Sequence, residues 1–140
     1  MQISDVRKRL LQTIERAKQH AAERRARNDE ATRAFGPFLD TIAVPMVRQV
    51  AQALRAEGHL FNVFTPSTSV RLMSDRSAED FIELVLDTSG DEPSVVGHTS
   101  RSRGHRVLES EQTLGAPGEL SEEDVLEFLL RALEPLLERR

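Results

Sequence analysis

Apolar residues in the first 34 positions recur at steps of three and four, the spacing that places them on one face of an α-helix. The large side chains stop at Ile14, and alanine continues the face among charged and amide residues. No Gly or Pro precedes Gly36 and Pro37, so the pattern predicts one long helix over residues 1–34. The apolar positions are Ile3, Val6, Leu10, Leu11, Ile14, Ala17, Ala21, Ala22, Ala26, Ala31 and Ala34.

The length of this helix exceeds the size of the domain. At 1.5 Å per residue it would extend roughly 48 Å. A compact chain of 140 residues would have a diameter of about 37 Å. We therefore expect one end of the helix to protrude, or to lie against another molecule.

A second helix, the central helix of the core, is predicted over residues 37–57, with Pro37 in its first turn and Gly58 as its stop. Pro45 removes a backbone hydrogen bond inside this segment, so the helix is expected to kink near residues 41–44 or to begin there. Its apolar positions are Phe38, Leu39, Ile42, Val44, Met46, Val47, Val50, Ala51 and Leu54.

From His59 onward the apolar period changes to two residues, which indicates β-strands. The expected strands cover residues 60–65, 70–74, 81–88, 94–100 and 106–111. Their short connections favour an antiparallel meander of four or five strands within residues 59–112. Ile82, Leu84 and Leu86 alternate with polar residues, so helices are expected to cover mainly one face of the sheet.

The last helix is predicted over residues 121–139. Ser121 and Asp124 have the spacing of a capping box, and Pro135 is expected to bend or end the helix. Its apolar residues are too many for one narrow stripe, so it should be buried on two sides, either by this chain or by another subunit. They are Val125, Leu126, Phe128, Leu129, Leu130, Leu133, Leu136 and Leu137.

These elements predict a single α+β domain over residues 1–140. Composition agrees, because 39% of the residues are hydrophobic and 30% are charged. The absence of Cys excludes disulfides, thiolate zinc sites and cysteine nucleophiles. The first residues contain no apolar signal core and no apolar run is long enough for a membrane span, so we expect a cytoplasmic protein with no membrane partner.

Charge is distributed unevenly along the chain. Residues 1–33 carry nine basic and five acidic groups, whereas residues 107–140 carry three basic and nine acidic groups. The two ends should therefore attract each other. Either the first and last helices pack side by side within one chain, or two chains pair through them. A further alternative is that the first helix folds back on the second.

Motifs for catalysis, phosphate loops, cofactors or metals are missing, so we expect neither an enzyme nor a cofactor or metal site. A two-residue turn at residues 102–103 would make His98 and His105 diagonal neighbours, with Glu109 nearby. A ligand or active site on the polar sheet face near His98, Glu109 and Glu83 is the weakest of three functional hypotheses.

The second hypothesis is nucleic-acid or phosphate binding by residues 98–106, which contain Arg101, Arg103 and Arg106 and no acidic residue. The basic first helix would assist. The acidic total and the lack of aromatics among the basic groups argue against it. Five or six of the phenylalanines are expected in the core: Phe35, Phe38, Phe61, Phe64, Phe81 and Phe128.

The first hypothesis is a non-enzymatic protein-interaction domain, a homodimeric bacterial adaptor, chaperone or regulator that binds itself, another protein, or both. Its contact would be made by the first helix and the outer side of the last helix. The expected interface residues are Ile14, Ala17, Ala21, Leu126, Leu130 and Leu137.

Overall fold

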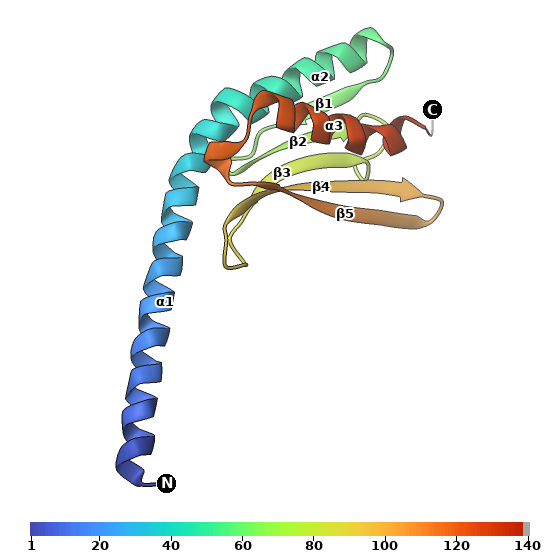
Figure 1. Ribbon diagram of the computed structural model, residues 1–140. Helices are drawn as coiled ribbons and strands as arrows, with labels where there is room; N and C mark the ends of the chain where they lie inside the picture. The colour runs from blue at the N-terminus through green and yellow to red at the C-terminus, as the bar shows by residue number, and fades with distance from the viewer. Residues whose placement is uncertain (139–140) are drawn as a thin grey trace.

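The computed structural model, which describes residues 1–138, is an α+β fold with a long bent N-terminal helix, a five-stranded antiparallel meander and a C-terminal helix (Figure 1). Helices α2 and α3 cover one face of the sheet, and α1 runs away from the domain (Figure 1). The predicted fold class is confirmed. The elements are α1 Ile3–Phe38, the π-helical turn η1 Leu39–Ala43, α2 Val44–Ala56, β1 Phe61–Phe64, β2 Ser69–Ser74, β3 Phe81–Asp87, β4 Ser94–Arg103, β5 Arg106–Gly115, the 3-10 turn η2 Pro117–Glu119 and α3 Glu122–Leu137.

The predicted break at Gly36 and Pro37 is wrong, because the helix continues through both residues to Phe38. It is interrupted instead at η1, where the Val44 N–H donates to the Leu39 carbonyl five residues back. This wider turn precedes Pro45, whose ring would clash with the carbonyl of a regular helix. The expected kink at residues 41–44 is therefore present, and α1, η1 and α2 form one bent rod.

The strands lie in the order β1-β2-β3-β4-β5, and each pairs antiparallel with its neighbour in sequence. Short connections leave no room for crossovers, as the sequence predicted. Gly104 is the first residue of the two-residue loop between β4 and β5, and its φ of 63° is a conformation that glycine adopts without strain.

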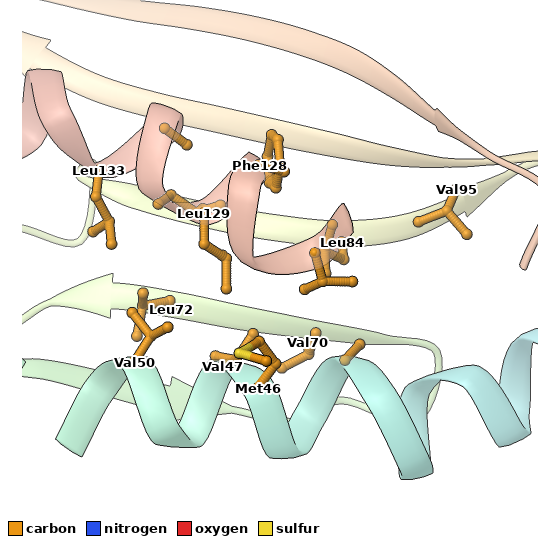
Figure 2. Packing of buried hydrophobic residues seen from close by; sticks show 14 of the residues in the cluster. Met46, Val47, Val50, Val70, Leu72, Leu84, Val95, Phe128, Leu129 and Leu133 are labelled. Carbon is orange, nitrogen blue, oxygen red and sulfur yellow. The ribbon is translucent and has the colours of Figure 1, made fainter. Parts of the chain in front are cut away.

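The core lies between the sheet and the two covering helices (Figure 2). The two helices lie side by side on the same face of the sheet. Helix α2 contributes Met46, Val47 and Val50 to the core, and α3 contributes Phe128, Leu129 and Leu133. Of the six phenylalanines, Phe64 is 46% exposed and Phe81 is only partly buried, so the expectation of five or six in the core is wrong. Both project from strand positions that face away from the helices.

Helix α3 begins with the predicted capping box. The Ser121 hydroxyl accepts from the Asp124 N–H, and the Asp124 carboxylate accepts from the Ser121 N–H. The backbone and side-chain hydrogen bonds from Ser121 lower the pKa of Asp124. The helix ends two residues after Pro135, and no helix in residues 1–138 is long and apolar enough to cross a membrane.

Candidate protein-binding surfaces

Helix α1 leaves the domain with an uncovered apolar row. Residues 1–20 are all exposed, and α1 meets the rest of the chain through its C-terminal part, beside η1 and η2. Arg27 Nε donates to the Asp91 carbonyl at 3.3 Å, at the level where the rod reaches the β3–β4 loop. We define the α1 row as Ile3, Val6, Leu10, Ile14, Ala17 and Ala21. The last three positions lie eleven residues after the first three, and a spacing of eleven residues is close to three full helical turns. All six residues therefore lie on one side of the helix.

The α1 row includes three of the residues expected at an interface. Ile14 is 41% exposed, Ala17 is exposed and Ala21 is half-buried. The large members nearer the N-terminus are more open, with Ile3 at 87% and Leu10 at 57%. Two expectations are wrong: α1 neither packs along α3 nor folds back on α2, because α1 and α2 continue in one rod.

A second apolar surface is the groove between α2 and α3, of about 920 Å³, which we call the α2–α3 groove. Its α3 wall contains Leu126, Leu130 and Leu137, the other three residues expected at an interface. Leu130 is 56% exposed, whereas Leu126 and Leu137 are half-buried. Helix α3 is thus apolar on two sides, one against the sheet and one along this groove.

The α2 wall of the groove was not predicted. Met46, Val50 and Leu54 stand one turn apart on α2 and pack into the core while their outer edges line the groove. Gln49, Ala53 and Glu57 also line this side of the groove, and so does His59, which follows the helix. The spacing in the sequence marks a broad apolar face on α2, but it carries no information on which helix borders that face.

The three arginines of the β4–β5 hairpin lie on the side of the sheet that α3 covers. Gly97 of β4 lies under Phe128 of α3. Side chains alternate between the two faces of a strand, so Arg101 and Arg103, which lie four and six residues after Gly97, are on the same face as Gly97. Arg106 pairs with Arg103 across the hairpin. Arg101 lines a groove of about 390 Å³ together with Arg131 of α3, which the sequence did not indicate. Within residues 1–138, none of these four arginines has a carboxylate within 4.0 Å.

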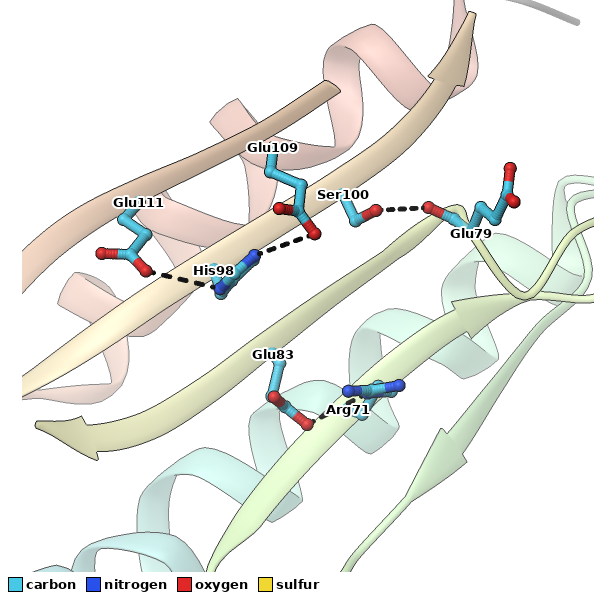
Figure 3. Close-up of polar contacts among 7 residues, drawn as sticks. All are labelled: Arg71, Glu79, Glu83, His98, Ser100, Glu109 and Glu111. Carbon is cyan, nitrogen blue, oxygen red and sulfur yellow. Dashed lines mark hydrogen bonds and ion pairs between the residues drawn. The ribbon is translucent and has the colours of Figure 1, made fainter. Parts of the chain in front are cut away.

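The predicted neighbourhood of His98 and His105 is wrong. The turn is at residues 104–105, so His98 pairs with Glu111 and Ser100 with Glu109. His98 lies between two carboxylates: its Nδ1 is 3.6 Å from Glu111, and its Nε2 is 3.8 Å from Glu109 (Figure 3). The turn lies at Gly104 because its positive φ suits the first loop position, which Ser102 would occupy only with strain.

The polar sheet face is occupied by side-chain pairs. Arg71 donates to Glu83 at 3.0 Å, and its guanidinium stacks over the Phe81 ring at 4.0 Å (Figure 3). Phe81 in turn stacks on His98. No group of three His, Asp or Glu side chains suited to a metal ion occurs in residues 1–138. Glu83, which the sequence placed at the hypothetical ligand site, is instead paired with Arg71.

Comparison with protein families, curated proteins and solved structures finds no match to this chain.

Proposed function

We propose that this protein is a non-enzymatic protein-binding module that works as a homodimer, as a small bacterial adaptor, chaperone or regulator in the cytoplasm would. The observation that carries the proposal is the α1 row on a helix that leaves the domain. A solvated helix normally places polar side chains all around its surface, whereas Val6, Leu10 and Ile14 remain 51%, 57% and 41% exposed.

Free in water, a helix as short as residues 3–20 is marginally stable, because nucleation is costly and no core supports it. A partner helix or groove would supply the missing apolar contacts. Ala17 and Ala21 would let that partner approach closely. A second copy fits the charge distribution, because the basic residues 1–33 of one chain would attract the acidic residues 107–140 of another.

The test is the mass of the protein in solution and its response to charge in the α1 row. Twice the chain mass of 15.7 kDa is expected at micromolar concentration. Ile14→Glu with Ala17→Arg should give monomers, because both side chains are exposed and enter the contact. The pair is also spaced to attract along the helix, so the helix itself is retained.

Gln12→Glu with Gln19→Arg is the matched control, because these exposed residues lie on the opposite side of α1. It should leave the dimer intact. A wild-type mass of 15.7 kDa, with unfolding that does not depend on protein concentration, would rule out the homodimer.

A second candidate function is nucleic-acid binding by Arg131 of α3 and the three arginines of the β4–β5 hairpin. Two observations favour it: the four residues lie on the same side of the sheet, and within residues 1–138 none of them is paired with a carboxylate. Replacing Arg101, Arg103 and Arg106 by Ser should abolish retention on DNA or RNA at low salt, and wild-type retention should fall steeply as salt rises. Replacing the exposed Arg48, Arg55 and Arg76 by Ser changes the charge equally and should matter less. Absence of wild-type retention at low salt would reject this function.

A further inference from the structure

Two apolar surfaces of the chain are open in residues 1–138: the α1 row and the α2–α3 groove. We propose that the α1 row of one copy lies in the α2–α3 groove of a second copy, and that the second copy's row lies in the groove of the first. This inference rests on the proposed self-association and specifies which surface meets which. It uses a common mode of recognition, an amphipathic helix whose apolar face enters an apolar groove.

The two surfaces have matching lengths. On α1, Ile3 to Ile14 spans eleven residues, and on the α3 wall of the groove Leu126 to Leu137 also spans eleven. At 1.5 Å per residue both rows extend about 16 Å. Four large side chains of α1 can therefore lie along the whole wall, and the alanines would continue beyond its end.

Their charges are opposite. The described residues that line the groove include Glu57, Glu134 and Glu138 and no Lys or Arg. Residues 1–21 carry five basic and two acidic groups around the row. This complementarity favours the row entering a groove over two α1 helices packing on each other, because that contact would bring like charges together.

The row cannot reach the groove of its own chain. The α2 wall begins at Met46, and Ile14 lies 32 residues earlier in the same bent rod. The N-terminal part of α1 runs away from the domain (Figure 1). The occupant must therefore come from another molecule. A two-fold axis makes the exchange reciprocal, so that one dimer fills both grooves and buries both rows.

Engineered cysteines test the contact directly, because the chain has none of its own. Leu10 lies seven residues after Ile3, and Leu130 lies seven residues before Leu137, so the two face each other when α1 runs antiparallel to α3. When α1 runs parallel to α3 they are offset by three residues, about 5 Å along the axis. We expect a mixture of Leu10→Cys and Leu130→Cys chains, one of them carrying a mass tag, to oxidise mainly to mixed covalent dimers. Replacing the first partner by Gln12→Cys, on the far side of α1, should reduce the yield at least 10-fold.

Leu130→Asp gives a second measurement. Leu130 is 56% exposed, so the charge should leave the fold intact, which unfolding at low concentration verifies. The dimer dissociation constant should rise at least 30-fold, because a carboxylate would enter an apolar and already acidic contact.

The outcomes separate this inference from the proposed function. A dimer that links Leu10→Cys to itself and not to Leu130→Cys would overturn the groove contact and leave self-association standing. A dimer that Leu130→Asp does not weaken would do the same. A protein that is monomeric at every concentration would overturn both.

Discussion

Phe128 of α3 lies directly over Gly97 of β4, and this contact sets how closely the helix approaches the sheet. A Cβ at position 97 would overlap the phenyl ring, and both residues are buried, so neither can move aside. Gly97→Ala should therefore lower the free energy of unfolding by about 1–3 kcal/mol, the usual cost of overpacking. Urea unfolding measures it, and Gly118→Ala is the control because a Cβ there meets open space.

An unchanged midpoint for Gly97→Ala would mean that α3 lies farther from the sheet.

Single residues differ in how much they reveal before a structure is known. Ser121 and Asp124 were predicted as a capping box because both partners lie within one turn of sequence, and this is confirmed. Gly97 gave no signal, because the atom that requires it belongs to another element.

At the scale of elements, Gly36 tests whether α1 is continuous. Had the helix ended there as the sequence indicated, Gly36 would need a positive φ and alanine would be unfavourable. In the structure it is helical, and a Cβ would meet nothing within 4 Å. The ring of the next residue, Pro37, crowds a Cβ at position 36 and offsets the usual gain, so Gly36→Ala should change the free energy of unfolding by less than about 0.5 kcal/mol. A loss of more than about 1 kcal/mol, as expected for alanine at a positive φ, would contradict the continuous helix and support two separate helices.

The order and type of every strand followed from the period of two, but the pairing of β4 with β5 did not. Residues 98–106 contain no apolar alternation strong enough to choose between a turn at Ser102 and one at Gly104. The backbone conformation of Gly104 decided it, and the shift separated His98 from His105. Where a helix or strand carries its own periodicity, the sequence is sufficient; where register depends on one dihedral angle, it is not.

At the scale of the molecule, half of the candidate site was predictable. The excess apolar surface on α3 and the overlong α1 are properties of single elements, so Leu130 and Ile14 could be named in advance. The α2 wall and the separation of the two surfaces depend on how elements pack, and the sequence alone does not supply that. In the structure α1 points away from α3 of its own chain, so the basic and acidic ends do not meet within one chain. The dimer proposed above would bring them together between chains.

Hydrogen exchange should test whether the proposed association stabilises the free part of α1. Amides of residues 3–20 are held only by a helix that is marginal alone, so their protection should come from the partner. Dilution through the dissociation constant should speed their exchange at least 10-fold, while buried α3 residues such as Leu129 should keep their protection. The Ile14→Glu, Ala17→Arg variant should exchange fast in residues 3–20 at every concentration. Protection of these amides that is equal in dilute and concentrated wild-type protein would show that α1 is stable without a partner, and the apolar row would then need another explanation.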